Sequence, residues 1–186
     1  MQSAANPRRW TALAVIALAQ FMVIMDTSII GVALPDIRAD LGFSPGGLSW
    51  VFNAYVIAFG GLLLLGGRLS ELLGAKRLFA LGWAVLAAGS LAAGLADSTG
   101  IEIAARAVQG AGAALIAPSA LTLLMMLFGH DPKELMKAFA VYGAAAPADG
   151  TAGVLISGVI AEWLTWPWVF SSTSRSRCSR WRSRRR

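Results

Sequence analysis

Residues 66–77 read GGRLSELLGAKR, a short charged segment between two long apolar runs. Glycine adopts backbone conformations that other residues avoid, so Gly67 and Gly74 indicate a tight turn. The charged side chains of the segment are costly to place in hydrocarbon and belong at a water-exposed surface. The segment therefore predicts a polar turn that joins two segments buried in lipid.

The two flanking runs belong to a larger pattern of long apolar segments. The chain of 186 residues is 56% hydrophobic and has a mean hydropathy of +0.63, which is unlike a soluble domain. About 20 apolar residues cross a bilayer core as a helix, which satisfies its own backbone hydrogen bonds. The sequence predicts an all-α membrane protein with five transmembrane helices, at residues 10–30, 48–65, 78–96, 101–128 and 136–160.

The net charge of +6 comes from the last residues of the chain. Residues 175–186 hold seven of the sixteen basic residues and no acidic one, which leaves nine basic and ten acidic residues elsewhere. The charge therefore does not predict nucleic-acid binding.

The remaining basic residues predict the orientation of the helices, because Lys and Arg concentrate in cytoplasmic connections. The connections on one side hold only Arg38. Those on the other side hold Arg8, Arg9, Arg68, Lys76, Arg77, Lys133 and Lys137. We therefore expect a cytoplasmic N-terminus and a multi-pass protein of the inner or plasma membrane.

Proline, serine and short polar segments predict the helix ends. Pro35 is expected to end the first helical region and to be followed by an external loop at residues 36–45. Ser44 or Ser49 is expected to cap the second helix. The short connection at residues 97–100 makes the third and fourth helices antiparallel neighbours, and Pro132 suits the first turn of the fifth helix.

The sequence does not predict a catalytic, metal or cofactor site. His130 and Cys178 are the only residues of their kinds, and no cluster of further metal ligands accompanies them. No phosphate-binding G-x-x-x-x-G-K-[ST] loop is present, nor a nucleophile with a neighbouring base. We therefore expect no enzyme, no metal and no cofactor.

The turn at residues 66–77 resembles the signature loop between helices two and three of the major facilitator superfamily. Gly67, Leu69, Gly74, Lys76 and Arg77 match that signature, and Glu71 stands where the family has Asp. The resemblance implies a conformational latch made of Gly67, Glu71, Gly74, Lys76 and Arg77, in which the acidic residue pairs with a neighbouring helix end. The alternative is a charged turn that only anchors the topology.

Residues 20–35, QFMVIMDTSIIGVALP, are similar to the first-helix signature of the fourteen-helix drug:proton antiporter branch of this superfamily. A carboxylate within a membrane span, here Asp26, costs about 3 kcal/mol unless it is paired, hydrated or protonated. The resemblance implies that Asp26 lies on the proton and substrate pathway. The alternative is a hydrated carboxylate near the external end that bonds only backbone groups.

Residues 106–114, RAVQGAGAA, resemble the fourth-helix motif of the family, in which the arginine lies near the proton pathway. Arg106 always carries its charge and needs a partner, for which Asp26 is suited. The resemblance assigns Arg106 and Gln109 to the pathway. Gly110 and Gly112 belong to a face of small residues suited to close helix packing. The alternative for Arg106 is a purely structural anchor.

Residues 142–158 resemble the fifth-helix antiporter motif, in which Gly153 and Gly158 match as helix-packing positions. Val154 replaces the usual proline, and Asp149 is an unusual carboxylate for its position. The resemblance to the superfamily therefore extends to this segment, with a weaker match to the drug-export motif than to the general pattern.

The resemblance covers residues 10–170 and predicts a partial N-terminal helical bundle at residues 1–170, part of a six-helix half. Residues 171–186 form a Ser/Arg-rich tail that cannot build a core. The expected family sequence after Phe170 can be converted into this tail by deleting one base, so we interpret the tail as a frameshift product.

The resemblance implies a secondary transporter that couples proton movement to efflux of drugs or small organic compounds. Its expected partners are a small-molecule substrate, protons and the lipid bilayer, and no nucleic acid. We expect no transport by the 186-residue chain alone, because alternating access requires two halves. The alternatives are an importer or metabolite exporter of the same superfamily, or a non-transporting membrane fragment.

Overall fold

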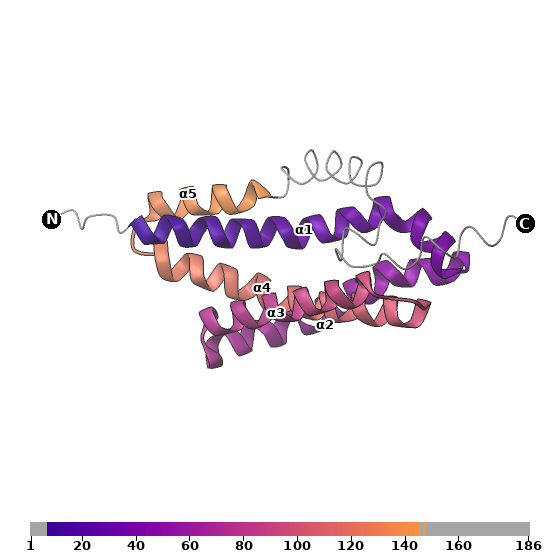
Figure 1. Cartoon of the computed structure of the whole chain (residues 1–186). Coiled ribbons are helices and arrows are strands. Elements are labelled where there is room, and N and C mark those ends of the chain that lie inside the picture. The colour runs from indigo at the N-terminus through magenta and orange to yellow at the C-terminus, as the bar shows by residue number, and fades with distance from the viewer. Residues whose placement is uncertain (1–6, 146, 148–186) are drawn as a thin grey trace, which may run out of the picture.

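A computed structural model describes residues 7–145 and 147, and this part of the chain is helical (Figure 1). Its elements are α1 (Pro7–Leu41), α2 (Pro45–Leu73), α3 (Ala75–Gly94), α4 (Thr99–Phe128) and α5 (Pro132–Gly143). Four segments within these helices are long and apolar enough to cross a membrane: Arg9–Ser28, Gly46–Leu73, Ala75–Gly94 and Thr99–Phe128.

Helix α4 is the centre of the described bundle, because it contacts each of the other four helices. Figure 1 shows α2 and α3 beside α4, with α1 and α5 together on the other side. The larger apolar cluster joins α1 to α4 through residues such as Leu13, Ile16, Ile116 and Phe128. A helix surrounded in this way can hold polar side chains out of contact with lipid.

Helix α1 does not end at Pro35, so the predicted end of the helix and the loop at residues 36–45 are wrong. The helix continues to Leu41, and Gly42, with a φ of 69°, begins the turn into α2. Proline inside a helix costs about 3 kcal/mol. Ile37 is fully buried beyond it, in a cluster with Ile30 and Val51, and burial of this apolar surface offsets the lost hydrogen bond.

The residues predicted to begin α2 and α5 are found at the starts of these helices. Ser44 caps α2, because its Oγ accepts a hydrogen bond of 3.1 Å from the backbone N–H of Gly47. Pro132 lies in the first turn of α5 as expected, behind the N-cap residue Asp131. Helices α3 and α4 pack closely together across the short connection at residues 95–98, as the sequence predicts for antiparallel neighbours.

Helix α5 is attached to α1 by polar contacts at two levels. Arg9 forms an ion pair with Glu134 through two contacts of 2.7 and 2.8 Å, and the Tyr142 hydroxyl donates to Gln20 Oε1 at 2.7 Å. The predicted fifth span at residues 136–160 begins in α5, and most of it lies outside the described residues. So do Asp149, Gly153, Gly158 and the tail.

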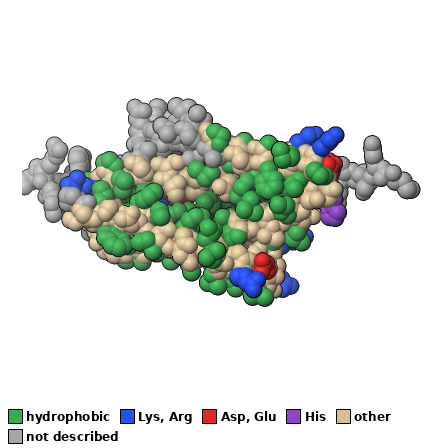
Figure 2. All heavy atoms as spheres, turned by 180° about the vertical axis from the view of Figure 1, so that it is seen from behind, with side chains coloured by type: hydrophobic (Ala, Val, Ile, Leu, Met, Phe, Trp, Pro, Cys, Tyr) green, Lys and Arg blue, Asp and Glu red, His purple; other side chains and the backbone are tan. Residues whose placement is uncertain are grey.

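The surface of the described bundle has an apolar middle and charged ends. Figure 2 shows one face, on which Lys and Arg side chains lie toward both ends and Asp, Glu and His side chains lie toward one of them. Leu64 and Ile57 are 85% and 61% exposed. Large apolar side chains in such positions suit contact with lipid tails rather than with water.

Candidate functional site

An ion pair between α1 and α4 lies in the interior of the bundle. Arg106 Nη1 is 2.7 Å from Asp26 Oδ2, and the exposed fractions of the two side chains are 0% and 11%. The partner predicted for Arg106 is therefore the one found, and Asp26 is not a hydrated group that bonds only backbone. A buried pair of this kind is retained only when further hydrogen bonds satisfy it.

Three further contacts hold the Arg106 guanidinium. Its Nε donates to the backbone carbonyl of Val51 at 3.2 Å, and Nη1 also donates to Gln109 Oε1 at 2.9 Å. The guanidinium lies over the ring of Tyr55, with Cζ 4.7 Å from the ring centroid. This cation–π contact and the carbonyl tie α4 to α2.

Gln109 connects the ion pair to α3. Its Nε2 donates to Asp26 Oδ1 at 2.8 Å and to Ser90 Oγ at 2.9 Å. A side chain at Gly89 would meet Gln109 Cγ at 2.7 Å, so glycine is needed there for α3 to come this close. The site thus joins α1, α2, α3 and α4. The structure brings together all three residues predicted for the pathway: Asp26, Arg106 and Gln109.

The sequence did not point to Tyr55 or Ser90 as parts of this centre, nor to Glu102 as a buried residue near it. Tyr55 and Ser90 are single polar residues in apolar helices, and only the packing of the helices shows that they face Arg106 and Gln109. Glu102 stands in the first turn of α4, where an acidic residue favours the helix N-terminus. The sequence signal that could have identified Glu102 was its position one helical turn before Arg106.

Gly110 and Gly112 lie where α4 comes close to the backbones of neighbouring helices. A Cβ at Gly110 would collide with the backbone carbonyl of Tyr55, and one at Gly112 would lie 2.6 Å from the backbone nitrogen of Leu86. The two glycines therefore let α2 and α3 approach α4 on neighbouring faces. This close approach brings Tyr55 within reach of the Arg106 guanidinium.

The turn between α2 and α3 is built around Gly74, whose φ of 86° is accessible mainly to glycine. This confirms the predicted turn. Gly67, in contrast, lies inside α2 and a Cβ added there would meet no neighbouring atom within 4 Å, so the turn predicted at Gly67 is wrong. The adjacent Gly66 permits close helix packing, against the backbone carbonyl of Ala114.

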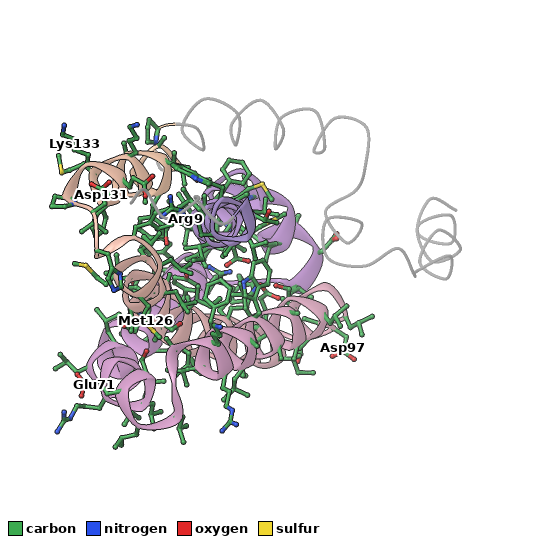
Figure 3. All side chains as sticks on the ribbon, turned by 90° about the vertical axis from the view of Figure 1, so that its left-hand side faces the viewer. Arg9, Glu71, Asp97, Met126, Asp131 and Lys133 are labelled. Carbon is green, nitrogen blue, oxygen red and sulfur yellow. The ribbon has the colours of Figure 1, made fainter. Side chains whose placement is uncertain are left out.

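Within residues 7–145, the charged residues of the turn do not form the predicted contact with a neighbouring helix. Glu71 pairs with Arg68 of its own helix at 2.6 Å, with side chains 64% and 79% exposed. In Figure 3 it points away from the bundle. Lys76 and Arg77 are also exposed. The latch therefore stays a prediction. Lys76 also borders, together with Arg9, an apolar pocket of about 410 Å³ between α1, α3 and α4.

Comparison with known proteins places this arrangement in a family. Residues 16–173 match the model of the Major Facilitator Superfamily. The chain belongs to the Major Facilitator Superfamily. The cephamycin export protein CmcT of Amycolatopsis lactamdurans is 49% identical over 156 residues, which are 84% of this chain and 32% of the relative. The puromycin resistance protein pur8 of Streptomyces alboniger is 45% identical over 163 residues, or 88% and 32%.

A third relative, the probable actinorhodin transporter of Streptomyces coelicolor, is 37% identical over 155 residues, which are 83% of this chain and 26% of the relative. This superfamily member thus spans about a third of the length of the curated relatives it matches. The family and the apolar helices confirm a multi-pass protein of the plasma membrane with an all-α fold. The number of spans and the side of the N-terminus stay predictions.

Proposed function

We propose that this chain is the N-terminal part of a proton-coupled exporter of drugs or other small organic compounds. The observation that carries the proposal is the buried centre of Asp26, Arg106 and Gln109 among membrane-spanning helices. Relatives named for cephamycin export and puromycin resistance support the substrate class and the direction. The proposal assigns the chain no catalytic reaction and no nucleic-acid partner.

The centre is suited to proton coupling because only one of its two charges can be removed. Arginine keeps its charge at any physiological pH, whereas a proton can neutralise the Asp26 carboxylate. Protonation would remove the attraction to Arg106 Nη1 and leave the guanidinium in need of another anion or dipole. Because the contacts of Asp26 and Gln109 join α1, α3 and α4, this change would alter how the helices are held together.

The proposed orientation places the N-terminus in the cytoplasm. Six basic side chains lie at the end of the bundle that contains the start of α1, the α2–α3 turn and the start of α5: Arg9, Arg68, Lys76, Arg77, Lys133 and Lys137. Arg38 lies near the opposite end of α1. Lys and Arg concentrate on the cytoplasmic side of membrane proteins, so this end would face the cytoplasm.

A chimeric transporter tests the proposal. The segment of the cephamycin export protein that aligns with this chain would be replaced by the corresponding residues of this chain, because 49% identity over 156 residues favours correct assembly. Inverted membrane vesicles would be energised with a proton gradient, and uptake of a fluorescent lipophilic dye would be followed. We expect uptake that stops when an uncoupler collapses the gradient.

Matched variants separate the centre from general effects of charge. Asp26→Asn in the chimera should abolish gradient-driven uptake, whereas Asp97→Asn, at an exposed position between α3 and α4 (Figure 3), should leave it unchanged. Uptake that persists at full rate in the Asp26→Asn chimera would contradict the proposed role of this centre. Uptake insensitive to the uncoupler would contradict proton coupling.

A further inference from the structure

A second acidic side chain is buried near this centre, and one of its oxygens has no partner among the described residues. Glu102 is 1% exposed, and its Oε2 has no hydrogen-bond partner among the described residues. It takes part in none of the ion pairs found in the described part of the chain. A buried carboxylate in this situation is strongly unfavourable when ionised, because nothing replaces its lost hydration.

Arg106 lies on the same helix, and its Nη2 is likewise buried and has no hydrogen-bond partner in the part of the chain that the structure describes. Glu102 precedes Arg106 by four residues on α4, so the two side chains share one face of the helix. An acidic residue four positions before a basic one is the favourable order for a helical ion pair. A change of side-chain rotamer would bring the two groups together.

The balance of charge in this region requires one proton. Asp26 of α1 and Glu102 are the acidic groups, and Arg106 is the basic group that pairs with Asp26 and lies one helical turn after Glu102 on α4. Tyr55 of α2 is neutral beside them, and α3 contributes the uncharged Ser90. With both carboxylates ionised, the buried region would carry one uncompensated negative charge in a low-dielectric environment.

We propose that Glu102 is a second proton-binding carboxylate, which alternates with Asp26 as the counter-ion of Arg106. In the described state Asp26 is ionised and bound to Nη1, and Glu102 holds the proton. In the alternative state the O–H bond of Glu102 is broken and an O–H bond forms on Asp26. The ionised Glu102 then pairs with Nη2, and the net charge of the region is unchanged.

This inference deepens the proposed proton coupling and depends on it for its role in transport. The position of Glu102 along α4 indicates from which side of the membrane a proton would reach it. The start of α4 packs beside the end of α1 and the start of α2, as shown by Ile103 in the cluster of Ile37 and Val51. Glu102 therefore lies nearer than Arg106 to the end of the bundle that is external in the proposed orientation. A proton that enters from outside would reach Glu102 before Asp26.

Infrared spectroscopy of the 186-residue chain in lipid nanodiscs tests the inference without a transport assay. Protonated carboxyl groups absorb apart from ionised ones, and ¹³C-labelled glutamate shifts the bands of Glu but not those of Asp. We expect a label-sensitive band of a protonated glutamate at neutral pH. It should disappear in Glu102→Gln and remain in Glu71→Gln, which changes an exposed residue.

The decisive variant is Asp26→Asn. It removes the counter-ion of Arg106, so Glu102 should ionise and its protonated band should be lost at neutral pH. A band that survives in folded Asp26→Asn would overturn the exchange, and absence of the band from the wild-type chain would overturn the proton on Glu102. The wild-type and Glu102→Gln spectra decide the second point even if Asp26→Asn does not fold.

The infrared result and the flux result can fail separately. A protonated Glu102 in a chimera without gradient-driven uptake would contradict proton coupling and leave Glu102 as a buried acid. Gradient-driven uptake by a chain that lacks the protonated glutamate band would contradict only the inference about Glu102.

Discussion

Two ion pairs of similar length in this chain should differ several-fold in their contribution to stability. Arg106 and Asp26 are 2.7 Å apart, with side chains 0% and 11% exposed. Arg68 and Glu71 are 2.6 Å apart and mostly exposed. Replacement of one acidic residue by alanine in each pair therefore compares the same interaction in a buried and an exposed setting. Both replacements are made in a Glu102→Gln background, so that Glu102 cannot take the place of Asp26 as the counter-ion of Arg106.

The expected magnitudes follow from what each alanine leaves behind. Asp26→Ala leaves a fully buried guanidinium without its carboxylate, and leaves Gln109 Nε2 with Ser90 as its remaining acceptor. Loss of one partner from a buried pair costs about 3–5 kcal/mol. Glu71→Ala leaves Arg68 in solvent, where such a pair contributes about 0.2–1 kcal/mol.

The assay is equilibrium unfolding in mixed micelles, with a denaturing detergent added stepwise and helix content followed by circular dichroism. We expect the free energy of unfolding to fall by about 3–5 kcal/mol for Asp26→Ala and by no more than about 1 kcal/mol for Glu71→Ala. The reasoning is refuted if the two variants differ by less than about 1 kcal/mol, because Arg106 would then have an alternative partner of similar strength.

Four other substitutions should behave as follows in the same or related assays. Gly110→Ala should lower the free energy of unfolding by about 1–3 kcal/mol, because its Cβ meets a backbone carbonyl of α2; Gly67→Ala, with open space around it, should change it by less than about 1 kcal/mol. Gln109→Leu should cost about 1–3 kcal/mol by leaving buried polar atoms without partners; no loss of stability would contradict the bridging role. Glu134→Gln should weaken the contact of α5 with Arg9, measured as faster hydrogen exchange in α5 while α4 is unchanged.

The sequence predicts the helices of this protein more reliably than their ends. Long apolar segments can only be helices in lipid, so the existence of the spans follows from hydropathy alone. The end of α1 depends on tertiary contacts instead. The penalty of Pro35 is local, whereas the burial of Ile37 against residues of α2 requires the packed bundle. A reading of local signals therefore stopped α1 six residues early.

The candidate site was likewise predictable from the sequence only in part. Asp26 and Arg106 could be paired from the sequence because a charge in a membrane span needs an opposite charge, and the candidates were few. Ser90 and Tyr55 could not be placed, because an uncharged polar residue is tolerated on many faces of an apolar helix. Their roles follow only from the rotation of α2 and α3 about their axes, which the glycines facing α4 determine.

The depth of the centre bears on the path of the proton. Arg9 and Asp26 are 17 residues apart on α1, or about 26 Å along the helix, which is close to the thickness of a bilayer core of about 30 Å. If Arg9 lies at the cytoplasmic surface, as proposed, Asp26 lies in the outer part of the membrane.

This asymmetry suits an exporter driven by inward proton movement. A proton from outside then has a short path to the buried carboxylates, and Glu102, one helical turn of about 5.4 Å beyond Arg106, lies on the external side of that path. Asp26 has Gln109 and the Arg106 guanidinium as its hydrogen-bond partners. Release of a proton toward the cytoplasm would therefore require these contacts to rearrange, so the proposed exporter would couple proton passage to a change in helix packing rather than allow a leak.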